Sequence, residues 1–351
     1  MTLRTEIIST HPEFPWLDPS ETTSIEAFLH QRGWIDPDEH VTTCGKAGEG
    51  NMNLTLRIAT GMRSIILKQA RPWVEKYDHI PAPWDRILYE QGFYERIKSI
   101  PDVAAAMPEL LASDSHARAI VLEDLGAAND FTNVYNGDSL AGKDRQALAA
   151  YLAVLHTATR EDADPEFVNR EMRLLNHEHI FVFPLAEDNG IDLEPFEPEL
   201  HSSAEELRGD SVYLDRLQET GDRYLADGPC LLHGDYFPGS WLHTPQGLRI
   251  IDPEFCYYGD PEFDLGVGLA HLRLAGRGIG EATQFLNDYR AQANELEIQE
   301  RWIARYASSE IMRRLLGVAQ LPIAPSIKTR RNLLADSRRA MTTETIEALW
   351  S

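Results

Sequence analysis

Residues 231–264 constrain this chain more than any other stretch, because they bring three carboxylates to one turn-rich region. A Thr-Pro-Gln-Gly sequence at 244–247 lies between two strand candidates, and Pro and Gly in so short a gap predict a hairpin. The open end of that hairpin would place Asp235 beside Asp252 and Glu254. Carboxylates that close raise one another's pKa unless a cation lies between them, and a hard divalent cation is their natural partner. The alternative is that all three are ordinary turn acids, since Asp favours turns.

The charge balance of the chain excludes several classes of partner. Its 56 acidic and 33 basic residues give a formal net charge of −23, whereas binding to nucleic acid or to an anionic membrane needs clustered Lys and Arg. No run of about 18 apolar residues is present, so no membrane span is expected, and the first residues lack the apolar core of a signal peptide. The chain has three cysteines, Cys44, Cys230 and Cys256, an odd number that does not suit a disulfide framework, and none has metal-ligand spacing. These features predict a cytoplasmic protein with no nucleic-acid or membrane partner.

The apolar patterning changes along the chain from strands to helices. Strands of period two come first, the one at 119–122 as a sheet edge, and helical periodicity takes over afterwards. The stretch 161–200 is acidic and is expected to be irregular. The change predicts an α+β chain with two parts, 1–126 and 127–351. Strands are expected at 40–44, 54–58, 64–68, 119–122, 240–243 and 248–251, and helices at 84–97, 144–160, 203–226, 279–294 and 298–320.

A glycine-rich loop between the first two expected strands has a composition that suits phosphate binding. Gly48 and Gly50 let backbone N–H groups approach phosphate oxygens, but Asn53 stands where a dinucleotide fingerprint needs a third glycine. A loop between antiparallel strands, with Lys68 on the next strand, is the layout of the phosphate cover of protein kinases. Glu90, in the middle of the following helix, would pair with Lys68. The alternatives are a plain hairpin with a surface lysine and a solvated helical glutamate.

Taken together, these motifs are similar to those of the aminoglycoside-phosphotransferase and choline-kinase superfamily, and within it to those of the methylthioribose kinases. The resemblance extends over most of the chain. Asp-Pro-Glu-Phe stands in the place of the Asp-Phe-Gly of protein kinases. Six segments carry the resemblance, namely the loop 48–53, the run 67–73, the segment 122–125, His233-Gly234-Asp235, Asp252-Pro253-Glu254-Phe255 and Arg313-Arg314.

The resemblance implies a bilobal protein-kinase-like fold that uses ATP and Mg²⁺. Residues 1–126 would form a small antiparallel β-sheet lobe that binds the nucleotide through the glycine-rich loop and a hinge. Residues 127–351 would form a larger, mainly helical lobe with the catalytic loop, the metal site and the acceptor site. The residues implied for nucleotide binding are Gly48, Gly50, Asn51, Asn53, Lys68, Glu123 and Leu125.

The same resemblance assigns roles in phosphoryl transfer. Asp235 would accept a hydrogen bond from the acceptor hydroxyl and act as base late in the reaction. Asp252 and Glu254 would hold Mg²⁺, with Ser240 as a further ligand. The residues implied for acceptor binding are Asp235, Arg313, Arg314, Tyr236 and Trp241, and those implied to be structural are Glu90, His233 and Asp264. The alternative for the arginine pair is a surface or ion-paired role near a helix end.

The loop 236–241 departs from the family pattern because it is bulkier and more aromatic, although Ser240 is as in the methylthioribose kinases. The resemblance implies an ATP-dependent kinase that phosphorylates a hydroxyl of a sugar-like acceptor, most like 5-methylthioribose, giving the 1-phosphate. The alternatives are an aminoglycoside, choline or other small-alcohol phosphotransferase, a catalytically silent nucleotide-binding protein and a metal-dependent phosphoesterase. Methylthioribose kinases are dimeric, which suggests a homodimer.

Overall fold

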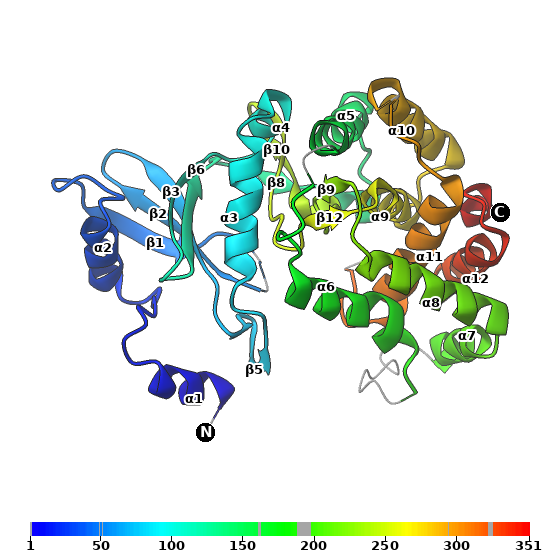
Figure 1. Ribbon diagram of the computed structural model, residues 1–351, viewed down its shortest axis with the longest axis horizontal. Helices are drawn as coiled ribbons and strands as arrows, with labels where there is room; N and C mark the ends of the chain where they lie inside the picture. Colours follow the sequence, from blue (N-terminus) through cyan, green and yellow to red (C-terminus); the bar gives the residue numbers. More distant parts are fainter. Residues whose placement is uncertain are drawn as a thin grey trace. The chain divides into compact units, whose positions relative to one another are not determined.

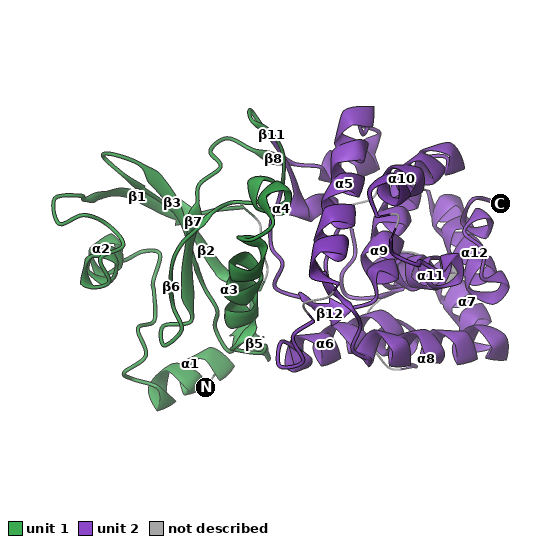
Figure 2. Cartoon of the chain, turned by 45° about the horizontal axis from the view of Figure 1, so that its top comes forward, with its two compact units in different colours: residues 1–128, 244–249 green, residues 129–243, 250–351 purple. Residues whose placement is uncertain are grey.

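The computed structural model (Figure 1) describes residues 2–48, 50, 52–160, 163–187, 198–293, 295–321 and 326–351. The chain divides into two compact units, which Figure 2 colours separately. Unit 1 consists of residues 1–128 with 244–249, and unit 2 of residues 129–243 with 250–351. Within the described part of the chain, no helix is both long enough and apolar enough to cross a membrane.

Unit 1 is built on one antiparallel sheet of five strands in the order β1-β2-β3-β7-β6. The strands are β1 (Val41–Lys46), β2 (Leu54–Thr60), β3 (Ser64–Gln69), β6 (Leu110–Asp114) and β7 (Ala119–Glu123). The predicted N-terminal antiparallel sheet is therefore confirmed. The predicted edge position of β7 is wrong, because β7 pairs with β3 on one side and with β6 on the other. An interior position explains why residues 119–122 are buried without interruption.

Helix α2 (Thr22–Gln31) covers one face of this sheet. Its residues Ile25, Phe28 and Leu29 form one apolar stripe, which packs in a common core with alternate residues of β2 and β3. Those alternate residues are Leu54, Leu56, Ile58, Ile65 and Leu67. Since successive side chains of a strand point to opposite faces, the intervening Lys68 points to the other face.

Helix α3 (Arg86–Ile97) contacts β6 and β7 and supplies the partner of Lys68 described below. It is followed by the short helix α4 (Pro101–Ala105). The sequence patterning did not reveal several elements of unit 1. They are α1 (Leu3–Thr10), the paired strands β4 (Trp73–Val74) and β5 (Tyr77–Pro81), helix α4 and strand β6.

Unit 2 is mainly helical (Figure 1), and its centre is α9 (Pro261–Leu274), of which nearly every residue is buried. A helix that is apolar on all sides must be surrounded by other elements, and α9 packs against α11 (Glu300–Leu316), which packs in turn against α12 (Ile327–Thr343). The remaining helices are α5 (Gly142–Thr159), α6 (Arg170–His177), α7 (Pro198–Arg208), α8 (Ser211–Leu225) and α10 (Ile279–Gln292).

Two predictions for unit 2 are wrong. Helix α6 and the π-helical turn Glu178–Val182 lie in the stretch that was expected to be irregular, of which residues 161–162 and 188–197 lie outside the described residues. The single helix expected at 203–226 consists of two helices, α7 and α8. Asp210 separates them, because its side chain accepts the backbone N–H of Tyr213 and caps α8.

Short strands lie near the two ends of the segment 231–264. Strand β9 (Cys230–Leu232) pairs with β12 (Tyr257–Gly259). The predicted hairpin is present as β10 (Trp241–Thr244) and β11 (Gly247–Ile250), with β8 (Asn129–Asp130) beside β10. The chain is therefore an α+β protein with an N-terminal antiparallel sheet and a helical C-terminal part, as predicted.

Candidate active site

The loop that follows β9 is held by a buried carboxylate of α9. Asp264 accepts hydrogen bonds from the backbone N–H groups of His233 at 2.8 Å and Gly234 at 3.1 Å. Nε2 of His156, on α5, lies 3.3 Å from the same carboxylate. A carboxylate with several donors around it is a strong anchor in a buried setting. The bracing contacts expected of Asp264 are present, and they fix the backbone from which Asp235 projects.

Gly234 and His233 join this loop to the segment after β11. Gly234 has a φ of 84°, and a Cβ there would collide with the carbonyl of Phe255, so only glycine fits. Nε2–H of His233 donates to the carbonyl of Ile251 at 2.9 Å, and Nδ1 accepts the N–H of Asp235 at 3.4 Å. Burial lowers the pKa of His233, which agrees with this neutral tautomer. The segment that carries Asp235 and the segment that carries Asp252 and Glu254 are thus neighbours.

The turn from Asp252 to Glu254 is fixed through its backbone. Asp252 has a φ of 63°, which is rare for a residue with a side chain and is a form of strain that clusters at functional sites. Nδ2 of Asn169 donates to the carbonyls of Glu254 and Cys256, both at 2.9 Å. The two side chains of this turn, Asp252 and Glu254, carry the carboxylate oxygens that Mg²⁺ prefers as ligands.

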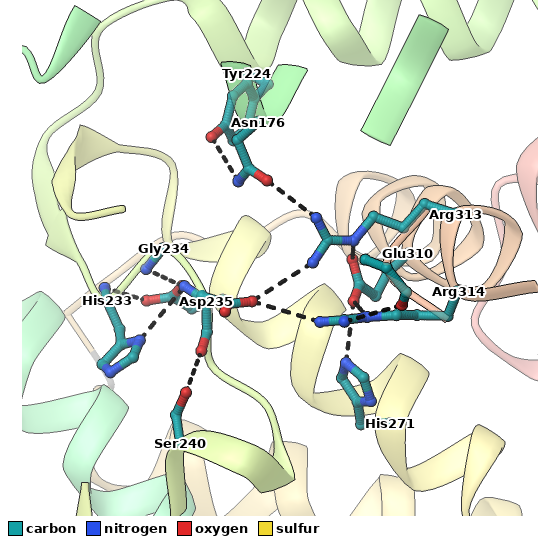
Figure 3. Close-up of polar contacts among 12 residues, drawn as sticks. Asn176, Tyr224, His233, Gly234, Asp235, Ser240, His271, Glu310, Arg313 and Arg314 are labelled. Atoms are coloured by element: carbon teal, nitrogen blue, oxygen red, sulfur yellow. Dashed lines mark hydrogen bonds and ion pairs between the residues drawn. The ribbon is translucent and has the colours of Figure 1, made fainter. Parts of the chain in front are cut away.

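Asp235 faces two arginines of α11 (Figure 3). Nη2 of Arg313 and Nη2 of Arg314 both lie 3.5 Å from Oδ1 of Asp235. The two arginine side chains are only 8% and 7% exposed, whereas that of Asp235 is 24% exposed. The surface form of the alternative is therefore wrong, whereas its ion-paired form, near the end of α11, is present. The arginines hold a carboxylate whose side chain is itself partly exposed.

Glu310, one turn before the arginines on α11, balances their charge. Its Oε1 accepts a hydrogen bond from Nε of Arg314 at 2.7 Å, and its Oε2 lies 2.7 Å from Nε of Arg313. The formal charges of the two guanidinium groups and of the two carboxylates, those of Glu310 and Asp235, thus sum to zero. Breaking a buried ion pair is strongly destabilising, because an uncompensated charge remains. The site depends on all four groups.

Further contacts hold each guanidinium group in place. Nη1 of Arg313 donates to Oδ1 of Asn176 at 3.0 Å, and Nδ2 of Asn176 donates to the hydroxyl of Tyr224 at 3.0 Å (Figure 3). The guanidinium of Arg314 lies 4.7 Å from the ring centroid of Phe237, within the range of a cation–π interaction. These contacts come from α6, α8 and the loop after β9, so three segments orient the arginine pair.

A buried histidine completes the network behind Glu310. Nε2–H of His271 donates to Oε1 of Glu310 at 3.0 Å, and the hydroxyl of Tyr135 donates to Nδ1 of His271 at 2.6 Å. Burial lowers the pKa of His271 to about 4, so the ring is neutral at neutral pH. Burial raises the pKa of Glu310, but Arg313 and Arg314 outweigh it and hold that pKa well below its usual value.

The pKa of Asp235 is set by opposing influences. Burial raises it above the ordinary value for Asp, while Arg314 and Arg313 act against the rise and Glu310 adds to it. A carboxylate whose basicity is raised in this way is better able to accept a proton than a free one.

Side chains of the loop 236–241 lie in packed surroundings. Tyr236 is fully buried, and its hydroxyl donates to the carbonyl of Leu148 at 2.9 Å. Trp241 is buried beside the ring of Tyr236, with centroids 5.4 Å apart. The hydroxyl of Ser240 donates to the carbonyl of Asp235 at 3.0 Å. Tyr236 and Trp241, which the resemblance implied for acceptor binding, thus lie in the interior. Their apolar area is more stable when it is buried.

Lys68 and Glu90 of unit 1 form a buried ion pair. Nζ of Lys68 donates to Oε1 of Glu90 at 2.6 Å, and the two side chains are 5% and 0% exposed. The predicted pair is present, and the alternatives of a surface lysine and a solvated glutamate are wrong. The pair joins β3 to α3 and fixes the position of the ammonium group.

The glycine-rich loop joins β1 to β2 in the same sheet. Gly48 has a φ of 80°, which calls for glycine, and apart from its chain neighbours no atom of the described residues lies within 4 Å of a Cβ built there. Around Gly50, Oγ1 of Thr55 is the described atom that comes as near as 4.0 Å. Asn53 is buried, and Asn51 lies outside the described residues. Among these positions Gly48 and Gly50 leave room for a ligand to approach the backbone.

Glu123 and Leu125 lie at and just beyond the end of β7. The N–H of Glu123 donates to the carbonyl of Glu109 at 2.9 Å, and the N–H of Glu109 donates to the carboxylate of Glu123 at 3.3 Å. Asp124 accepts the N–H of Gly126 at 2.9 Å. The backbone of this segment is therefore well fixed.

Sequence reasoning missed Glu310, His271 and Asn176. Glu310 precedes the arginines by three and four positions, a spacing that pairs charges on a helix and that could have revealed it. His271 and Asn176 gave no such signal, because their contacts join residues 39 and 137 positions apart.

Comparison with known proteins places this chain in a family. The chain matches the phosphotransferase enzyme family (APH) over residues 44–301. A methylthioribose kinase of Bacillus cereus is 26% identical over 270 residues, which are 73% of this chain and 66% of that protein, just under two thirds of the relative's length. A microcompartment-associated aminopropanol kinase has a TM-score of 0.56 at 17% identity, with 92% of this chain and 99% of that chain covered. LicA in complex with AMP has a TM-score of 0.53 at 16% identity, with 93% and 97% covered.

Since the family match extends over well more than half of its length, the chain belongs to the phosphotransferase enzyme family. The two solved structures share the α+β fold of this chain, and at such low identity their similarity supports a conclusion about the fold alone.

Proposed function

We propose that the protein is a small-molecule kinase that transfers the γ-phosphoryl group of ATP to a hydroxyl group of a sugar-like acceptor. The acceptor is most like 5-methylthioribose, and the product is its 1-phosphate. Family membership and the similarity to methylthioribose kinases support this proposal. The observation that carries it is the convergence of Arg313 and Arg314 on the partly exposed carboxylate of Asp235.

Asp235 orients the acceptor. Its carboxylate accepts a hydrogen bond from the acceptor hydroxyl, whose oxygen forms a bond to the γ-phosphorus as the bond from that phosphorus to the β–γ bridging oxygen breaks. The hydroxyl proton passes to Asp235, and ADP leaves with the bridging oxygen. The raised pKa of Asp235 favours this late proton transfer.

The arginine pair favours a neutral acceptor. Arg313 and Arg314 place two positive charges within 3.5 Å of the oxygen of Asp235. Guanidinium N–H groups donate to sugar hydroxyls and also offset negative charge that develops during transfer. Choline or an aminoglycoside would bring its own positive charge next to two guanidinium groups whose charge Glu310 and Asp235 already balance, so the cluster offers such a cation no net attraction. The sugar-like acceptor is therefore the better of the two candidates.

Residues of the other motifs bind the nucleotide and its metal ion. The N–H groups around Gly48 and Gly50 and the ammonium of Lys68 bind phosphate oxygens, and the backbone near Glu123 and Leu125 binds the adenine. Asp252 and Glu254 fit Mg²⁺ because hard cations prefer carboxylate oxygens, and Ser240 is a further candidate ligand. When bound, Mg²⁺ neutralises charge on the phosphates.

An ATP-consumption screen tests the proposal. The panel contains methylthioribose, 5-deoxyribose, other pentoses, choline and an aminoglycoside, each with the wild type, Arg313→Ala and the control Arg301→Ala. Arg301 lies on α11 and is exposed. We expect turnover of a sugar, with kcat/KM for the acceptor lowered only by Arg313→Ala. Turnover of choline or the aminoglycoside alone would contradict the sugar-like acceptor, and an effect of Arg313→Ala on the KM for ATP alone would contradict the acceptor role of Arg313.

A further inference from the structure

A second group of ligand-type side chains lies in unit 1, on the side of the sheet that α2 covers. Glu26 and His30 come from α2, and His40 directly precedes β1. One ligand atom from each of the three residues lies within 4.8 Å of the others. Oε1 of Glu26 is 3.1 Å from Nδ1 of His40 and 4.0 Å from Nε2 of His30. None of these residues has a part in the proposed phosphoryl transfer.

The separations match those of ligands around one small ion. Zn²⁺ binds imidazole nitrogen and carboxylate oxygen at about 2.0–2.2 Å, so its tetrahedral ligands lie about 3.3–3.5 Å from one another. The distances of 3.1 and 4.0 Å from Glu26 lie on either side of that value. Glu26 and His30 are four positions apart on a helix and so share one face. Small side-chain rotations therefore suffice to bring the three atoms around a common centre.

The backbone on either side of the three residues is anchored by packing and strand pairing. Helix α2 is anchored in the core of unit 1 through the buried residues Ile25 and Leu29, and β1 begins with Val41 paired to Thr60. The carboxylate of Glu26 is itself oriented, because its Oε2 accepts the N–H of Val41 at 2.7 Å. Contacts of this outer kind hold a ligand in its binding orientation and leave its other oxygen for the ion.

The geometry points to a binding site for a divalent transition-metal ion of the Zn²⁺ class, formed by Glu26, His30 and His40 with water as the fourth ligand. Two imidazoles and one carboxylate select Zn²⁺ and its neighbours over Mg²⁺ and Ca²⁺, which prefer oxygen ligands alone. The side chain of His40 is 71% exposed, which leaves the fourth position open to solvent. The ion would tie α2 to the start of β1.

A Zn²⁺ titration tests the site in the full-length protein. Isothermal titration calorimetry is done in excess Mg²⁺, which competes at carboxylate-only sites, with the wild type, His40→Ala, His30→Gln and the control His79→Ala. His79 is an exposed histidine of β5. Loss of a residue that merely supports a ligand weakens metal binding by about 10- to 100-fold. We therefore expect the wild type and His79→Ala to bind one equivalent of Zn²⁺ with the same affinity. We expect His40→Ala and His30→Gln to bind Zn²⁺ more than about tenfold more weakly.

Co²⁺ gives a second readout that weak surface binding does not reproduce. Bound tetrahedrally, Co²⁺ should show strong visible absorption in the wild type and in His79→Ala, and His40→Ala should lose it. Because His40 is exposed, His40→Ala should retain the fold, and its unchanged far-UV circular dichroism checks this. No Zn²⁺ uptake by the wild type, or an equal affinity in all four proteins, would overturn the proposal.

Discussion

Replacing Glu310 by Gln removes one charge from the buried site and keeps the shape of the side chain. Arg313 and Arg314 then face a single carboxylate, that of Asp235, at 3.5 Å. Removing one partner of a buried ion pair costs about 3–5 kcal/mol. Since Asp235 remains and the amide oxygen of Gln still accepts one hydrogen bond, we expect the lower end of that range, about 3 kcal/mol. That loss lowers the ratio of folded to unfolded protein by roughly 100-fold.

Urea unfolding followed by circular dichroism measures this loss. Glu300→Gln is the matched control, because Glu300 lies on the same helix and pairs with Arg290 at the surface, where the two side chains are 52% and 40% exposed. A surface pair contributes at most about 1 kcal/mol, so the control midpoint should move little. If Glu310→Gln and Glu300→Gln had the same midpoint and slope, the claim that Glu310 balances a buried charge cluster would be refuted.

Three further predictions concern single residues. Lys68→Met should lower kcat/KM for ATP by about 10- to 150-fold, because a hydrogen bond to a charged group contributes about 1.5–3 kcal/mol; steady-state kinetics showing no change would exclude Lys68 from phosphate binding. The pKa of His271 is about 4 in the folded state against an ordinary 6.5. Between these two pH values the unfolded chain binds the proton more readily, so the free energy of unfolding should fall as the pH falls from 6.5 to 4. His271→Gln should flatten that dependence in urea titrations, and an unchanged slope would contradict the assigned pKa. Gly234→Ala should destabilise the protein by more than about 2 kcal/mol in thermal unfolding. The control Gly280→Ala, in open space on α10, should be neutral or stabilise the protein by up to about 1 kcal/mol. Equal effects of the two substitutions would contradict the strain argument.

The elements of the fold that were predictable are those whose own residues set their structure. The alternation at 54–58 and the turn at 244–247 are local signals, and β2 and the β10–β11 hairpin follow them. The interior position of β7 was missed because β6, which only residues 115–118 separate from it, was not recognised as a strand. Similarly, the break between α7 and α8 depends on one capping residue, Asp210, within an otherwise helical pattern.

The candidate site shows the same division. Motifs indicated the Lys68–Glu90 pair and the brace at Asp264, because these contacts come from residues within recognisable segments. The sequence could not show which way Tyr236 points, since an aromatic residue in a loop can face either a ligand or the interior. The role of Asn176 depends on a contact with Arg313 across 137 positions, which only the folded chain brings together.

The most direct test of the proposed function is the transfer of ³²P from γ-labelled ATP to 5-methylthioribose by the wild type and by Asp235→Asn. We predict a labelled sugar phosphate from the wild type, with phosphorus NMR locating the ester at the 1-position. We predict no labelled sugar from Asp235→Asn, although that variant should still bind ADP. Equal transfer by both proteins would contradict the role of Asp235, and release of labelled inorganic phosphate without any labelled sugar would contradict the proposed kinase activity toward this acceptor.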